Sequence, residues 1–199
     1  MLLDASILIN DSFIKPSNPL SEKNIDKVWD FNKLPEHLDE NSWIAEFCRD
    51  LLEYTNQIAT ELGETPTVLY IHGLKDRGDL GIDMGIGVRL RDKQLTNVRE
   101  YAEIFLSSQN TAPGGSVIAD IRRSLRLKNY WNSRLKKEKW YSVWIGEIYF
   151  AGRPEQLPQI HKNLKRPADS IQIEINRTLR ENIDYTVSLL SDWLTSYDN

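Results

Sequence analysis

The chain has 199 residues, of which 40% are hydrophobic and 10% aromatic, and its formal net charge is −4. This apolar mass excludes disorder over most of the length, and the length suits a single domain spanning residues 1–199, with an irregular segment at 1–42. The negative charge gives no general reason to expect nucleic acid or anionic lipid as a partner.

Cysteine content and the N-terminal segment bear on the compartment. Cys48 is the only cysteine, so no internal disulfide can form, and a cytoplasmic location is predicted because small secreted domains usually carry several. For Cys48 itself we favour a small buried side chain over a reactive thiol. The first ten residues, MLLDASILIN, are interrupted by Asp4 and are too short for a signal peptide or a membrane span.

The first half of the chain predicts one helix, one strand and a loop, followed by a second helix. Within 1–42 only Ser6–Asn10 favours a strand. An amphipathic helix is then predicted between Ser42 as N-cap and Gly63 as stop signal. Its apolar residues recur at spacings of three and four: Ile44, Phe47, Leu51, Tyr54, Ile58 and Leu62.

After Pro66, the unbroken apolar run Val68–Ile71 predicts a strand covered on both faces, as in a parallel sheet between helices, that ends at His72. The glycine-rich residues 78–87 predict a tight loop that brings Asp83 near His72, although an ordinary turn is an equal alternative. A second helix is predicted over Asn97–Ser107.

In the second half, residues 140–150 favour a strand, and residues 170–177 alternate, with three isoleucines on one side and Gln172, Glu174 and Asn176 on the other. A last helix is predicted over Glu181–Ser196, with these residues facing inward: Ile183, Val187, Leu190 and Leu194. The fold class is therefore α/β, with a mixed, largely parallel sheet flanked by helices.

His72 and Glu174 are the strongest candidates for chemistry. An imidazole at the carboxyl end of a strand suits metal ligation or proton transfer, but a histidine that only hydrogen-bonds a loop is an equal alternative. A carboxylate in the middle of an apolar strand, as at Glu174, is costly unless it is paired, metal-bound or in a wet cleft, and burial suits it to general-base work. On spacing alone we favour the alternative for Glu174, an edge strand whose polar side faces water.

Three further residues are weaker candidates. Arg153 suits capture of a substrate carboxylate, or it is a surface arginine. For His161 the alternatives are a ligand, a substrate contact or a surface residue, and we favour a surface residue. His37, in a polar segment, is also predicted to be a surface residue.

Residues 122–141 carry eight basic residues against one acidic residue, with tyrosine and tryptophan between them. Such a mixture can bind nucleic acid, but we favour a solvated helix face because the chain as a whole is acidic.

Five segments, in order, resemble the N-formylglutamate amidohydrolases, whose fold is similar to that of the zinc carboxypeptidases. The resemblance covers roughly residues 28–198, and the most specific segment is QIEINR, 172–177. The others are DFNK at 30–33, YIHG at 70–73, GIDMG at 81–85, and the loop from Gly152 to His161.

The resemblance implies metal-assisted hydrolysis of an amide in an N-acyl amino acid or short peptide. It implies zinc as cofactor, His72 as a metal ligand and Glu174 as the general base that takes a proton from water. It further implies a substrate-binding role for Arg153, Asp83, Asn176 and Arg177.

The chain departs from the family at two places. Residues 1–29 contain no histidine, whereas the family has a Pro-His-x-Gly metal motif there, and a catalytic zinc normally takes three protein ligands. Lys33 stands where the family has arginine, and lysine cannot form the same planar fork. The alternatives are an N-terminally shortened form, a non-catalytic relative, or a rearranged site that uses His37 or His161; we favour a shortened or degenerate domain over an active zinc enzyme.

Overall fold

The structure is a computed structural model, and it describes residues 34, 41, 43–63, 65–89, 115–164 and 168–196. The predictions for the strand at Ser6–Asn10, the helix at Asn97–Ser107 and the surface position of His37 lie outside these residues. No helix within the described ranges is long and apolar enough to cross a membrane.

A four-stranded mixed sheet forms the centre of the fold. Its strands are β1 (Thr67–Leu74), β2 (Leu80–Gly85), β3 (Ser142–Ile145) and β4 (Asp169–Asn176), in the spatial order β1-β4-β2-β3. β1 runs parallel to β4 and β2 parallel to β3, while β2 and β4 are antiparallel. The predicted α/β class with a mixed, largely parallel sheet and flanking helices is confirmed.

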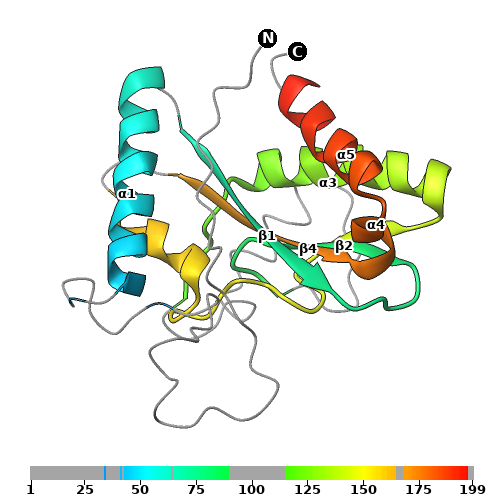
Figure 1. Ribbon diagram of the computed structural model, residues 1–199, viewed down its shortest axis with the longest axis horizontal. Helices are drawn as coiled ribbons and strands as arrows, with labels where there is room; N and C mark the ends of the chain where they lie inside the picture. Colours follow the sequence, from blue (N-terminus) through cyan, green and yellow to red (C-terminus); the bar gives the residue numbers. More distant parts are fainter. Residues whose placement is uncertain are drawn as a thin grey trace, which may run out of the picture.

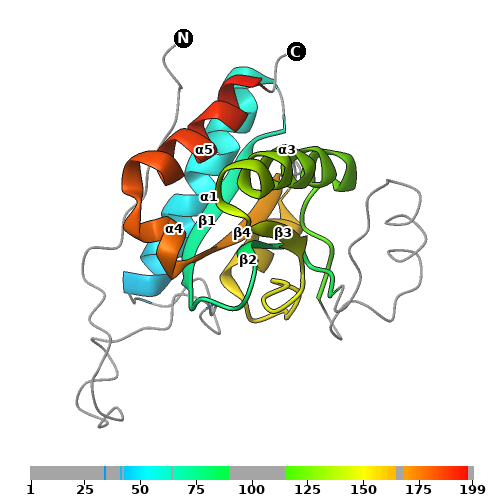
Figure 2. The same cartoon turned by 90° about the vertical axis from the view of Figure 1, so that its right-hand side faces the viewer.

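Helices cover both faces of this sheet (Figures 1 and 2). On one face lie α3 (Ile121–Lys139), the short α4 (Arg177–Glu181) and α5 (Ile183–Ser196). On the other lie α1 (Trp43–Leu62) and the 3₁₀ helix η3 (Leu157–Asn163), both packed against the β1 side chains Val68 and Tyr70. The sheet is therefore the middle layer of three, and each face meets a different set of helices.

The main core lies between the sheet and the α3–α5 side. The three isoleucines of β4 and the apolar residues of β2 pack there against Trp131 of α3 and Leu189 of α5. The isoleucines of β4, Ile82 and Met84 of β2, Trp131 and Leu189 are each at most 2% exposed. A smaller core, centred on Cys48 and Tyr70, joins α1, η3 and β1. Burial raises the pKa of Cys48 to about 11, which agrees with an inert buried side chain.

The alternation predicted for residues 170–177 is confirmed, but the favoured edge position is wrong. β4 lies between two strands and all eight of its residues are buried. Its polar side is covered by residues 146–164 rather than by water, as the contacts of Ser170 and Gly85 with this segment show.

Two predictions about strands are corrected. β1, predicted to be covered on both faces and to end at His72, lies at the edge of the described sheet and continues to Leu74, with Ile71 51% exposed. Residues 80–85, predicted as part of a loop, form the fully buried strand β2. The glycines had been interpreted as a sign of a loop. Gly81 and Gly85 instead lie in β2, where neighbouring groups leave no space for a Cβ.

The predicted bounds of the helices agree with the structure better than the predicted inward-facing residues do. α1 begins and ends as predicted, and Gly63 after it has a φ of +70°, but Tyr54 is 46% exposed. In α5, Ile183 and Val187, predicted to face inward, are 68% and 55% exposed, while Leu189 is buried. The helix is rotated because Leu189 packs into the core beside Trp131.

Candidate functional site

Three candidate residues meet in one row across the sheet. His72 on β1 pairs in register with Glu174 on β4, which pairs with Asp83 on β2. Neighbouring strands lie about 4.8 Å apart, and residues in register point to the same face. The sheet therefore places an imidazole and two carboxylates side by side, and we name His72, Glu174 and Asp83 the polar row.

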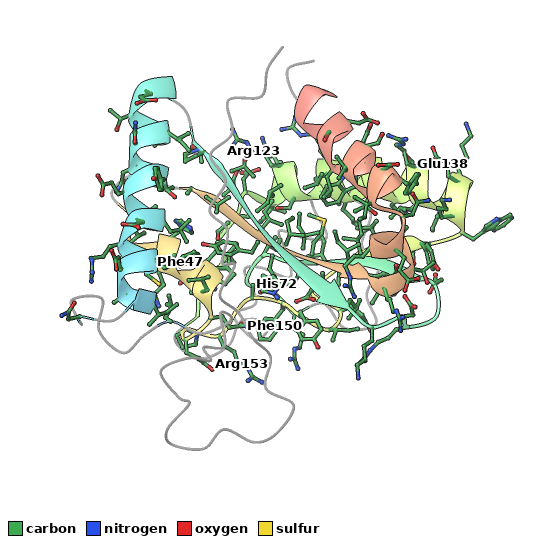
Figure 3. The ribbon with its side chains drawn as sticks, viewed as in Figure 1. Phe47, His72, Arg123, Glu138, Phe150 and Arg153 are labelled. Atoms are coloured by element: carbon green, nitrogen blue, oxygen red, sulfur yellow. The ribbon has the colours of Figure 1, made fainter. Side chains whose placement is uncertain are left out.

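The polar row lies on the face opposite the main core. Because side chains alternate along a strand, the isoleucines of β4 point to α3 and α5, and Glu174 points to the other face. Figure 3 shows His72 on the same side of β1 as Phe150 and Arg153, with Arg123 on the opposite side. Residues 146–152 form much of the cover over this face, since Gly85 of β2 contacts Tyr149 and Ala151.

Glu174 is a buried carboxylate with a neutral neighbour. It is 4% exposed, and its Oε1 accepts a hydrogen bond of 2.6 Å from Nε2 of Gln172. Burial raises the pKa of Glu174 above its usual value and the nearby Asp83 raises it further, while the Gln172 hydrogen bond and the Arg180 guanidinium work in the opposite direction. A carboxylate of raised pKa is suited to accept a proton near neutral pH.

Asp83 anchors the loop that covers the site. Its carboxylate accepts three backbone hydrogen bonds, from the N–H groups of Glu147 at 3.0 Å, Ile148 at 2.7 Å and Tyr149 at 2.9 Å. It is fully buried, and burial raises its pKa to about 6, with the three N–H groups opposing that shift. Both carboxylate oxygens are engaged, so the side chain holds residues 147–149 against β2.

His72 forms the accessible end of the polar row. Its side chain is half-buried, in contrast to the two carboxylates, because β1 has no strand on its outer side in the described sheet. The position leaves an imidazole between the exterior and a buried carboxylate, which is an arrangement that supports proton transfer or ligand binding.

His161 lies inside the molecule, so the favoured surface position was wrong. The residue is 3% exposed, and its Nε2 lies 2.7 Å from the hydroxyl oxygen of Tyr70. Burial lowers the pKa of His161 to about 4, so the imidazole is neutral at neutral pH, and it raises the pKa of Tyr70. The signal in the sequence was that apolar Leu157 and Ile160 precede His161 at helical spacing.

The remaining candidates stand apart from the polar row. Arg153 is exposed in the loop after Ala151. Asn176 is buried, and its amide caps α4 through Leu179 N–H and donates to the carbonyl of Leu80. Arg177 is exposed and pairs with Glu181 at 2.7 Å. Asn176 thus has a structural role, and Arg153 lies on the same side of β1 as His72 (Figure 3).

A pocket of about 510 Å³ opens at the other end of β4. Its lining includes Asp169, Arg123 and His161. Arg123 pairs with Asp169 at 2.8 Å, and Asp169 also accepts from the backbone N–H of Asp120. The pocket therefore lies at the start of β4, five residues before Glu174.

The described residues do not fit a zinc ion held by the protein. Among them, no group of three or more histidine, cysteine, aspartate or glutamate side chains is placed to hold a metal. In the polar row, both oxygens of Asp83 are bound to backbone N–H groups, which leaves His72 and Glu174, and a catalytic zinc normally takes three protein ligands.

In comparisons with known proteins, the chain matches no family model, no curated protein and no solved structure. The fold and the polar row define an α/β protein with a candidate site on one face of a mixed sheet. Its function has to be argued from the side chains themselves.

Proposed function

We propose that the protein hydrolyses an amide in a small N-acyl amino acid, in the manner of an N-formylglutamate amidohydrolase-like domain, with Glu174 as general base. The observation that carries this proposal is the register of His72 with Glu174 on adjacent strands. The sequence resemblance to that family, centred on residues 172–177, supports the same assignment.

In the proposed reaction, the substrate enters beside His72 and its amide carbonyl accepts a hydrogen bond from the imidazole. Glu174 removes a proton from a water molecule as the water oxygen attacks the carbonyl carbon. The same proton passes to the amide nitrogen as the C–N bond breaks, which releases the free amino acid and the acyl acid. The raised pKa of Glu174 makes its carboxylate a stronger acceptor for this proton.

Arg153 is the proposed partner of the substrate carboxylate. It is exposed and lies on the same side of β1 as His72 (Figure 3). Guanidinium groups bind carboxylates in a bidentate geometry, which would give preference to acylated amino acids over neutral amides.

The test is release of free amine from N-formylglutamate and other N-acyl amino acids, measured with and without added zinc. We expect Glu174→Gln to lower the rate at least about a hundredfold, because the general base is lost while the shape is kept. Glu181→Gln, which changes an exposed glutamate on α4, is the matched control and should keep the rate. Absence of amine release by the full chain under both conditions would overturn the proposal.

One observation favours a second candidate, a binding protein that retains the fold without turnover. Both oxygens of Asp83 are bound to backbone N–H groups, so Glu174 is the one carboxylate of the polar row that is not held by the covering loop. In this case N-acyl amino acids should bind with measurable heat in calorimetry, Arg153→Ala should weaken binding, and no amine should be released.

A further inference from the structure

The outer surface of α3 carries an exposed polar stripe with basic residues at both ends, and the proposed function does not use it. Trp131 and Leu135 on the inner side of the helix are fully buried in the main core. On the opposite side, residues spaced by three and four are all exposed and share one face of the helix. We define them as the outer stripe: Arg122, Arg126, Asn129, Ser133, Lys136 and Trp140.

The outer stripe concentrates positive charge in a chain whose net charge is −4. It contains no carboxylate, and its end is flanked by Lys137 and Lys139, both exposed. Glu138 lies off the stripe, 3.5 Å from Arg134, which also pairs with Asp192 of α5. Glu138 and Asp192 are therefore engaged with Arg134 between α3 and α5, while the three cations of the outer stripe are exposed on the opposite side of the helix.

Trp140, at the end of the stripe, is not explained by the fold. It is 85% exposed, the largest exposure among the large apolar side chains of the described residues. Its φ is +64°, in the left-handed region that glycine favours, and its N–H caps the carbonyl of Leu135. Any residue could provide that backbone N–H, and glycine would do so with less strain, so neither packing nor backbone geometry accounts for an indole here.

We propose that the outer stripe of α3 binds single-stranded nucleic acid, with the basic side chains on phosphates and Trp140 stacked on a base. Stacking on an aromatic ring combined with a basic track is the general mode of single-strand binding. A helix of 19 residues is about 28 Å long, which is enough for several nucleotides. Asn129 and Ser133 add uncharged hydrogen-bonding groups between the two basic ends.

The composition of the stripe argues against a membrane as the partner. An interfacial helix needs a broad apolar face, whereas the outer stripe has a single apolar side chain at one end. A lone exposed indole among cations matches a base flanked by phosphates better than it matches a lipid bilayer.

The experiment measures fluorescence anisotropy of a labelled single-stranded oligonucleotide, as DNA and as RNA, titrated with the full chain at low salt. We expect binding whose affinity falls with salt, with a slope of log K against log salt near about −2 to −3 for three or four phosphate contacts. Replacing Lys136 and Lys137 by glutamine should make that slope less negative, because fewer phosphates are contacted. Lys75→Gln, in the exposed loop after β1, is the matched control and should leave the slope unchanged.

Trp140→Gly separates binding from folding. Glycine suits the left-handed position, so the variant should melt at the same or a higher temperature than the wild type. Loss of stacking should weaken binding about tenfold or more. Tyr54→Ala, which removes another exposed aromatic from α1, should leave affinity unchanged.

Three outcomes would overturn the proposal. One is no binding of either oligonucleotide at low salt. Another is equal affinity of wild type and Trp140→Gly. The last is Trp140-dependent retention on phosphatidylserine vesicles with no retention on oligonucleotides, which would assign the stripe to a membrane surface.

Discussion

The two faces of β4 are both fully buried but are stabilised by different interactions. On the face toward α3 and α5, the isoleucines of β4 make apolar contacts in the main core. On the other face, Ser170 donates to the carbonyl of Pro158, Asn176 to that of Leu80, and Gln172 to Glu174. The first face gains stability from removal of apolar surface from water, and the second avoids a penalty because its polar groups have partners.

This difference indicates which face of the sheet can form a functional site. On the first face, the β2 and β4 side chains in the main core are apolar and offer no group for chemistry. The second face carries polar groups whose hydrogen bonds are almost complete, but the Oε1 of buried Gln172 and the Nδ1 of buried His161 have no hydrogen-bond partner among the described residues. Buried polar groups with open capacity mark the polar face as the one suited to bind a ligand.

The largest effect is expected from the apolar face. Trp131→Ala removes a fully buried indole that also donates to the carbonyl of Leu189 at 3.0 Å. We expect a loss of about 4 kcal/mol in the free energy of unfolding, measured by urea denaturation. Tyr54→Ala on α1 is the exposed control and should change it by less than about 0.5 kcal/mol. A loss for Trp131→Ala no greater than that of the control would contradict this account of the core.

The second-largest effect is expected on the polar face, at Asp83, which holds the covering loop against β2. Asp83→Ala leaves three backbone N–H groups without their acceptor, so we expect a loss of about 3 kcal/mol. Hydrogen exchange at residues 147–149 should become faster, since the loop is no longer held to β2. Asp50→Ala, an exposed position on α1, serves as control. Unchanged exchange at those three amides would show that another group holds the loop.

A pH dependence probes the polar face further, because it holds a buried histidine that titrates in the acid range. The pKa of His161 is lowered from 6.5 to about 4, so between these values the unfolded chain binds more protons than the folded one. The contribution of His161 to stability is therefore complete above pH 6.5 and falls by up to about 3 kcal/mol as the pH drops to 4.

His161→Gln, which keeps a partner for Tyr70, should lack this fall when the free energies of unfolding at pH 7 and pH 4.5 are compared. The pKa of Asp83, raised to about 6, acts in the opposite direction over part of the same range, and it is common to both proteins. The difference between wild type and variant thus isolates the histidine. An identical pH dependence in the two proteins would mean that His161 is not buried in neutral form.

The smallest effect tests the edge of the apolar face. Ile71 and Ile173 are partners in register, but Ile71 is 51% exposed and Ile173 is fully buried. Ile173→Val should cost about 1 kcal/mol and Ile71→Val less than about 0.5 kcal/mol in the free energy of unfolding. Equal losses would indicate that β1 is covered on its outer side, as the sequence pattern had suggested.

Much of the candidate site could be predicted from the sequence, but some of its residues have structural positions other than the predicted ones. The importance of Glu174 followed from a carboxylate among isoleucines, and that of His72 from its place after an apolar run. Asp83, expected in a loop near His72, lies instead in a strand of the same row, and Glu174 on β4 separates it from His72. The anchoring role of Asp83 and the Tyr70–His161 pair could not be predicted, because each joins segments more than sixty residues apart.

The local periodicities could be predicted from the sequence alone: the extent of α1, the alternation of β4 and the α/β class. These follow from the spacing of apolar residues along one segment, which the chain carries without reference to other segments. Only the tertiary structure decided that β1 lies at the edge, that the polar side of β4 is covered, and which side of α5 faces inward. The physical reason is that burial depends on which segments meet, and pairing between distant strands leaves no trace in the spacing of either strand alone.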